Sequence, residues 1–177
     1  MNIIEVTSPF DGKVVGTVPF SSTEEVLAVI DRAENTFLDK KNHLPKYKRI
    51  EILENVMKIM GSQIEELTNL CASEGGKPYI DSKVEIQRAI NGVKLAIEHL
   101  GAFEGKEIAM GHTASSANRM AYTFKEPIGV VASVSAFNHP FNLAVHQVIP
   151  ALAVGCPVII KPATQTPMSA VRLVEIL

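Results

Sequence analysis

The sequence predicts an α/β fold in which an N-terminal hairpin and several helices precede an incomplete Rossmann-like parallel sheet. Residues 127–177 read as strand, helix, strand and helix, which is how a parallel α/β sheet opens. Both strands, at 128–134 and 157–160, are almost continuously apolar and β-branched, as is typical of strands covered on both faces. Two such strands with one complete helix cannot cover their own faces. The sequence therefore predicts the front part of a longer fold.

The first elements of the chain are predicted to be a hairpin and a helix. Residues 2–20 contain two apolar runs on either side of a Pro-Phe-Asp-Gly turn at 9–12, whose last two residues tolerate positive φ. Ser22 and Glu25 then form a capping box, which predicts that a helix starts there.

Three further helices follow at the spacing of apolar residues that helices show. One starts near Pro45, because proline is favoured in a first turn. The next ends at the glycine pair 75–76. The longest runs from about Ile80 to Leu100.

The second half of the chain begins with an irregular segment at 101–117. Residues 118–125 alternate apolar and polar side chains, which predicts a half-exposed strand. Leu143–Val154 is predicted to be helical despite Pro150. Thr166 is the simplest N-cap for a final helix.

Composition excludes several classes of protein. The chain has 177 residues, of which 46% are hydrophobic, and a net charge of −2, which offers no field that would attract nucleic acid. Two cysteines do not make a secreted disulfide framework, and no basic start with an apolar stretch marks a signal peptide. No apolar run approaches the roughly 18 residues that cross a membrane. The expected location is cytoplasmic.

Polar residues at the ends of the two covered strands are the candidate site. Asn138 follows the first strand, and its amide could donate to an oxyanion during attack on a carbonyl. The alternative is a turn residue that bonds its own backbone. Lys161 ends the second strand, where open α/β sheets bind cofactors, or it is an ordinary surface lysine. Thr164 follows it and could line an adenosine pocket.

Other reactive side chains carry no predicted chemistry. His139 and His146 are seven residues apart, and no cysteine or carboxylate completes a ligand set, so no metal site is predicted. Cys71 and Cys156 have no neighbouring base and are predicted to be packed thiols. Two helical glutamates, Glu74 and Glu85, have no identifiable partner at an acid–base spacing, and the chain has no glycine-rich phosphate loop.

The residues around the candidate site resemble the aldehyde dehydrogenase superfamily. The matching blocks are 126–130 (EPIGV), 137–140 (FNHP), 150–156 (PALAVGC) and 158–167 (VIIKPATQTP). The opening turn at 8–12 and the EGGKP stretch at 74–78 also resemble the family's N-terminal region. The resemblance covers essentially the whole chain, but only about the first third of a family member.

The resemblance implies a role for each candidate residue. Asn138 would be the oxyanion-hole amide, and Lys161 would contact the adenosine ribose of NAD or NADP. Residues Ser135, Ala136 and Phe137 would form a wall of the cofactor cleft. NAD-preferring members carry glutamate where this chain has Thr164, so NADP is expected to be accepted. The nucleophilic cysteine and the general-base glutamate of the family would lie beyond residue 177.

Domain boundaries and partners also follow from the resemblance. Residues 1–117 would be the N-terminal hairpin and helices of the cofactor-binding domain, 118–126 a strand of the oligomerisation region, and 127–177 the first strands and helices of the Rossmann-like cofactor domain. The expected partners are a small aldehyde and further copies of the chain, in a homodimer or homotetramer, with neither nucleic acid nor membrane. The His139 variant of the loop resembles branches that act on small oxygenated or anionic aldehydes.

Two other interpretations remain open from the sequence. The chain could be a non-catalytic short homologue that serves as a binding or assembly module through 118–126. It could also be a self-contained nucleotide binder, although the missing phosphate loop disfavours that reading.

Overall fold

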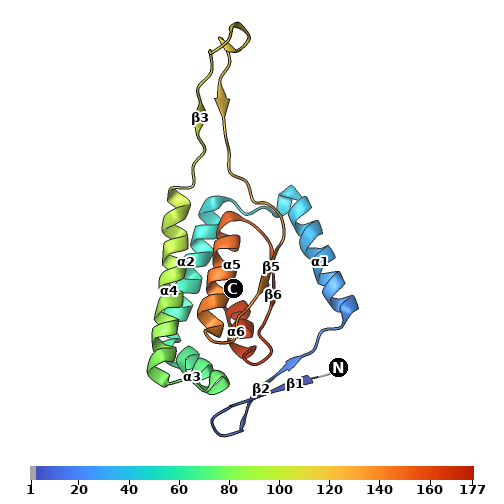
Figure 1. Ribbon diagram of the computed structural model, residues 1–177, viewed down its shortest axis with the longest axis vertical. Helices are drawn as coiled ribbons and strands as arrows, with labels where there is room; N and C mark the ends of the chain where they lie inside the picture. Colours follow the sequence, from blue (N-terminus) through green and yellow to red (C-terminus); the bar gives the residue numbers. More distant parts are fainter. Residues whose placement is uncertain (1–2) are drawn as a thin grey trace.

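The computed structural model describes residues 3–177 and shows a mixed α/β fold with three two-stranded sheets (Figure 1). In chain order its elements are β1 (Ile3–Thr7), β2 (Val14–Pro19), α1 (Thr23–Leu38), the 3₁₀ turn η1 (Lys40–Asn42), α2 (Lys46–Ser62), α3 (Ile64–Gly75), α4 (Tyr79–Gly101), β3 (Glu107–Ile108), the 3₁₀ turn η2 (Ala114–Ser116), β4 (Ala121–Tyr122), β5 (Val131–Val134), α5 (Pro140–Val154), β6 (Val158–Lys161) and α6 (Met168–Ile176).

The predicted N-terminal hairpin and capping box are confirmed. β1 and β2 pair antiparallel, and Ser8 closes the turn by accepting from the Gly12 amide at 2.8 Å. The Glu25 amide donates to Ser22 Oγ at 3.2 Å, and the Ser22 amide donates to Glu25 Oε2 at 2.8 Å. Residue 2 of the predicted hairpin lies outside the described residues.

Helix α5 is at the centre of the molecule. In Figure 1 it lies between α2 and α4 on one side and the β5–β6 strands on the other. Its sequence is apolar around most of its circumference, as expected of a buried helix. The largest side chains of the core come from five helices: Leu53, Met60, Leu67, Ile86, Val93, Phe141, Val145, Ile149 and Leu173.

The start of α5 is three residues earlier than predicted. It begins at Pro140 rather than Leu143, with proline in the first turn, where its missing N–H costs nothing. Pro150 lies inside the helix, and Gly155 ends it with φ at 98°, a left-handed conformation that favours glycine.

The parallel pair is confirmed, and one of its faces is only partly covered, as expected of strands that the rest of a longer fold would cover. β5 and β6 pair in parallel from Val131 opposite Val158 to Val134 opposite Lys161, with α5 as the connection. In Figure 1, α5 lies on one side of the pair and α1 on the other. Because α1 buries none of its own side chains fully, it covers the second face only in part. Val134 is 67% exposed, which a strand covered on both faces would not allow.

A long arm projects from the helices between α4 and β5 (Figure 1). Only Ala121–Tyr122 of the predicted strand 118–125 pairs, with Glu107–Ile108. Within residues 3–177 the apolar side of this predicted half-exposed strand is itself exposed, at 81% for Met120 and 84% for Phe124. Phe124 lies at the base of the arm and lines a shallow pocket with Leu44 and Phe103.

The last helix is capped by a distant carboxylate rather than by Thr166. Thr166 Oγ1 donates to the Phe137 carbonyl at 3.1 Å, and Pro167 is the N-cap. The amides of Met168 and Ser169 donate instead to the Glu74 carboxylate at 2.8 and 2.9 Å. Sequence patterns predict caps from neighbouring residues, whereas Glu74 lies 94 residues before Met168 in the chain.

Candidate active site

The two parallel strands end side by side and bring most of the predicted residues to one edge. The Ser135 amide donates to the Lys161 carbonyl at 3.0 Å, which extends the β5–β6 ladder by one bond. We call residues 135–138 and 161–164 the strand-end edge. Carboxyl ends of parallel strands are where open α/β sheets bind ligands.

The first half of the strand-end edge is a loop that two hydrogen bonds hold in place. Ser135 is buried and Phe137 is exposed, with half-buried Ala136 between them. Thr166 Oγ1 and the Lys77 ammonium donate to the carbonyls of Phe137 and Asn138, at 3.1 and 3.4 Å. Asn138 itself is exposed, so its amide is free to reach a ligand.

The second half of the strand-end edge carries an ammonium and a hydroxyl. Lys161 and Thr164 are both exposed, and Lys161 Nζ donates to Thr164 Oγ1 at 3.4 Å. Lys161 forms no ion pair within residues 3–177. An unpaired ammonium next to a hydroxyl suits a ribose or a phosphate.

A buried carboxylate orients the start of α5, and sequence reading missed it. The Glu85 side chain is fully buried, and its Oε1 accepts from the amides of Phe141 and Asn142 at 2.9 and 3.0 Å. A negative charge here also complements the positive end of the α5 dipole. Glu85 falls on the same face of α4 as the buried residues Ser82 and Ala89, and that position was the available signal.

Lys77 completes this cluster and connects it to the candidate residue. Its ammonium forms an ion pair with Glu85 Oε2 and lies 3.2 Å from His139 Nδ1. His139 Nδ1 is also 3.4 Å from Glu85 Oε2. We call Lys77, Glu85 and His139 the anchor cluster. It fixes the backbone on which Asn138 sits.

The two thiols are packed rather than reactive. Cys71 is fully buried, and its Sγ lies 3.3 Å from Ser169 Oγ. Burial, together with the nearby Glu85 carboxylate, raises the pKa of Cys71 to about 12. A thiol with that pKa stays protonated at neutral pH and is a poor nucleophile. Cys156 is 3% exposed.

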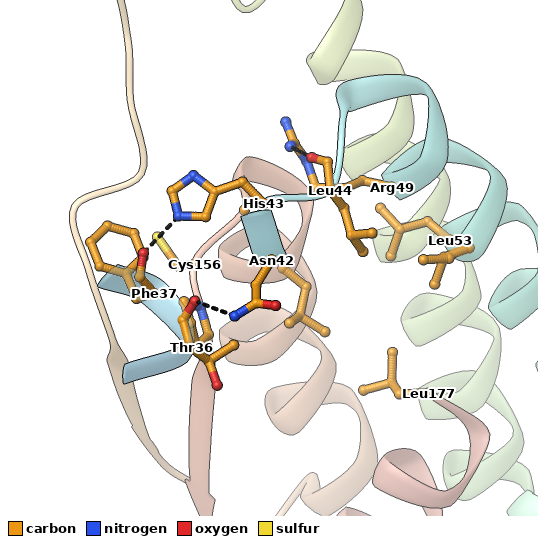
Figure 2. Close-up of a pocket in the computed structure, with 13 residues that line it drawn as sticks. Thr36, Phe37, Asn42, His43, Leu44, Arg49, Leu53, Cys156 and Leu177 are labelled. Atoms are coloured by element: carbon orange, nitrogen blue, oxygen red, sulfur yellow. Dashed lines mark hydrogen bonds between the residues drawn. The ribbon is translucent and has the colours of Figure 1, made fainter. Parts of the chain in front are cut away.

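A separate apolar cavity of about 340 Å³ lies away from the strand-end edge (Figure 2). Figure 2 shows Phe37, Leu44, Leu53 and Leu177 around it, with Cys156 in its wall. The polar groups shown are already paired: His43 Nε2 with the Phe37 carbonyl at 2.7 Å and the Asn42 amide with the Thr36 carbonyl at 3.4 Å. None of the predicted site residues lines this cavity.

Neither a membrane span nor a metal cluster is found in the part of the chain that the structure describes. No helix there combines the length and the apolar character needed to cross a bilayer. No three His, Cys, Asp or Glu side chains gather there as metal ligands would.

Relatives of this chain are aldehyde dehydrogenases of bacteria, archaea and plants. The lactaldehyde dehydrogenase of Methanocaldococcus jannaschii is 33% identical over 98% of this chain and 36% of its own length. For the NADP⁺ succinate-semialdehyde dehydrogenase GabD of Escherichia coli the identity is 36%, over 98% of this chain and 35% of the relative.

Solved structures agree with these relatives. Aldehyde dehydrogenase 21 of Physcomitrella patens, in complex with its product succinate, superposes with a TM-score of 0.92 at 33% identity, over 99% of this chain and 36% of that one. The glyceraldehyde-3-phosphate dehydrogenase GapN of M. jannaschii, complexed with NADP, superposes with a TM-score of 0.89 at 33% identity, over 98% of this chain and 36% of that one. The chain thus spans about a third of the length of its relatives, as their N-terminal portion.

The sequence model of the aldehyde dehydrogenase family matches residues 1–177, which is the whole of the chain. This match confirms the resemblance that the motifs indicate. The chain belongs to the aldehyde dehydrogenase family.

Proposed function

We propose that this chain is the N-terminal part of an NAD(P)-dependent aldehyde dehydrogenase that oxidises a small aldehyde to a carboxylic acid. The observation that carries the proposal is the strand-end edge, where an exposed amide and an unpaired ammonium follow paired parallel strands in a member of this family. The cysteine that forms the thiohemiacetal and the general base lie outside these residues. By themselves, the 177 residues are inactive.

Asn138 supplies the oxyanion contact in this proposal. When a thiolate attacks the aldehyde carbon, the carbonyl oxygen gains negative charge, and an amide N–H at about 3 Å stabilises it. The donor must be in place before the reaction starts, because reorganisation during the reaction would cost part of the gain. The anchor cluster supports this requirement, since it fixes both the carbonyl of Asn138 and the first turn of α5.

Lys161 and Thr164 hold the adenosine end of the cofactor in this proposal. The bound dinucleotide supplies a hydride acceptor. The ammonium of Lys161 donates to ribose hydroxyls or to a phosphate, and Ser135, Ala136 and Phe137 form the adjoining wall. Thr164 is neutral and does not repel a 2′-phosphate, so NADP is accepted as well as NAD. The NADP complex of GapN from M. jannaschii supports this choice.

The projecting arm suggests that the protein assembles into a homodimer or homotetramer. Two apolar side chains on it, Met120 and Phe124, are more than four-fifths exposed. The arm keeps its shape through backbone bonds, because the Thr123 amide donates to the Lys106 carbonyl at 2.9 Å. This arm also favours the second candidate function, a non-catalytic short homologue that acts as an assembly module.

One comparison of activities tests the proposal. We expect the full-length protein to reduce NADP with short aldehydes and the isolated 177 residues to show no turnover. Turnover by the 177 residues alone would refute the assignment of the nucleophile to another part of the protein. A full-length protein that oxidises no aldehyde, yet still associates through the arm, would favour the assembly module.

A further inference from the structure

The Lys77 ammonium has three acceptors next to Asn138. It donates to the Asn138 carbonyl at 3.4 Å and to His139 Nδ1 at 3.2 Å, and it forms the ion pair with Glu85 Oε2. An ammonium carries three N–H donors, so these contacts use all of them. The Lys77 side chain is only 15% exposed, and its position therefore depends on these partners more than on water.

The bond from Lys77 to His139 requires one protonation state of the imidazole ring. A lysine ammonium donates and cannot accept, so His139 Nδ1 is the acceptor and carries no proton. The neutral ring then has its proton on Nε2. This arrangement is therefore the one that an uncharged His139 allows, in which Lys77 has its full set of acceptors.

The same nitrogen of His139 also faces a carboxylate. Glu85 Oε2 lies 3.4 Å from Nδ1 and can accept from it once Nδ1 carries a proton. In that state Nδ1 no longer accepts from Lys77, and the imidazolium and the ammonium repel each other. Lys77, from the loop before α4, and Glu85, on α4, are the charged side chains with which His139 forms contacts of these kinds within residues 3–177.

The two protonation states of His139 differ in the loop and not in the helix that follows it. The His139 side chain is 42% exposed, so protons from solvent reach it, whereas the Glu85 side chain is fully buried. Glu85 Oε1 accepts from the amides of Phe141 and Asn142 in either state, so the start of α5 stays in place. Only the Asn138 carbonyl loses its donor when Lys77 moves away.

We propose that Lys77 is a positioning residue for Asn138 and that protonation of His139 removes Lys77 from the Asn138 carbonyl. This inference rests on the proposed function. Histidine changes its charge between about pH 5 and pH 8, which is the range in which most enzymes work. At the upper end of this range Lys77 holds the loop, and the Asn138 side chain is preorganised for an oxyanion. At the lower end the loop loosens, and part of that preorganisation is lost.

The pH dependence of kcat in the full-length protein is the first test. His139→Asn places an amide oxygen where Nδ1 stands, so Lys77 keeps its acceptor at every pH. Between pH 8 and pH 5.5 we expect kcat to fall about tenfold further in the wild type than in His139→Asn, which is part of the roughly hundredfold that loss of an oxyanion donor costs. KM should depend on pH equally in both proteins, because the donor acts on charge that develops during attack.

The control is His99→Asn, at an exposed histidine near the end of α4, and it should keep the wild-type profile. If His139 had only a structural role, its replacement would lower kcat by the same factor at every pH. Parallel pH profiles of kcat in the wild type and His139→Asn would therefore overturn the proposal.

Crystal structures of the full-length protein at pH 8 and pH 5.5 are the second test. At pH 8, Lys77 should lie within hydrogen-bond distance of His139 Nδ1 and the Asn138 carbonyl. At pH 5.5 it should leave both, while His139 Nδ1 approaches Glu85 Oε2. An unmoved Lys77 would overturn the proposal even if the protein oxidises aldehydes. If Lys77 moves but no aldehyde is oxidised, the proposed function fails and the proton-dependent contact stands.

Discussion

Asn138 and Lys161 are the two residues on which the proposed chemistry depends, and the structure brings their backbones to one edge. Lys161 pairs with Val134, and Asn138 follows four residues later. Both side chains are exposed, and within residues 3–177 neither forms a salt bridge nor caps a helix. Their roles stay predictions, which substitution tests directly.

Replacement of Asn138 by alanine should lower kcat about a hundredfold in the full-length protein, because one preorganised oxyanion donor is lost. KM should change little, since the donor acts chiefly on the charge that develops during attack. Steady-state kinetics with a short aldehyde measure both constants. Asn118→Ala, an exposed amide on the arm, is the matched control. An unchanged kcat in Asn138→Ala would remove Asn138 from the site.

Replacement of Thr164 by glutamate should lower the preference for NADP over NAD. A carboxylate beside Lys161 would repel the 2′-phosphate and accept bonds from the ribose hydroxyls of NAD. The ratio of kcat/KM for the two cofactors measures this change. Thr164→Gln introduces a side chain as long as glutamate but without its charge, so it separates the effect of charge from the effect of size. A ratio that does not fall in Thr164→Glu, relative to Thr164→Gln, would contradict the electrostatic argument.

Two helices in this fold start at carboxylates from other helices, Glu74 for α6 and Glu85 for α5. Each carboxylate accepts from two amides at a helix N-terminus, whose first N–H groups have no partner within the helix. The sequence predicted the existence of most helices from periodicity, and the two distant caps were missed. Local pattern rules address partners within a turn, whereas these partners are more than fifty residues apart.

Glu85→Gln should destabilise the chain by about 3 kcal/mol, because it leaves the largely buried Lys77 ammonium without its counter-charge. Urea unfolding of the 177 residues measures the loss. Lys83→Met breaks the exposed pair with Glu65 and is the control, for which little change is expected. Equal midpoints for Glu85→Gln and the wild-type chain would show that the anchor cluster contributes nothing to stability.

The stability that Glu74 confers should decrease as pH rises. Burial raises the pKa of Glu74 above its ordinary value of 4.5, so the folded chain binds this proton more tightly than the unfolded chain. The contribution is complete below pH 4.5 and is lost as pH rises through the folded-state pKa. Glutamine does not titrate, so the stability difference between wild type and Glu74→Gln should shrink from pH 4 to pH 7. Denaturation curves of both proteins at both pH values measure this difference. A stability difference that grows from pH 4 to pH 7 would contradict the expected direction.

The whole molecule consists of a helical core, an open parallel pair and an arm that reaches away from both (Figure 1). The βαβ order, the hairpin and the long helices could be predicted, because burial imposes the apolar periodicity on which such predictions depend. The open face at Val134 was expected, because one complete helix cannot cover both faces of the pair. The exposure of Met120 and Phe124 could not be predicted, since apolar spacing shows which side chains share a face and not what covers that face.

The double substitution Met120→Ser with Phe124→Ser should weaken self-association of the full-length protein. The exposed apolar arm is the surface that association would bury, and loss of two large side chains reduces that area. Sedimentation over a range of concentrations measures the shift towards monomer. Phe10→Ser, at a residue that is 90% exposed in the N-terminal hairpin turn, is the control. An oligomer as tight as the wild type would exclude these two arm residues from the interface.

The two carboxylate caps also set an order for biosynthesis. Helices α3 and α4 leave the ribosome before the helices that they cap, so Glu74 and Glu85 remain hydrated until α5 and α6 emerge. Each acid can leave water only when the helix that it caps has emerged, so Glu85 is expected to dock with α5 before Glu74 docks with α6.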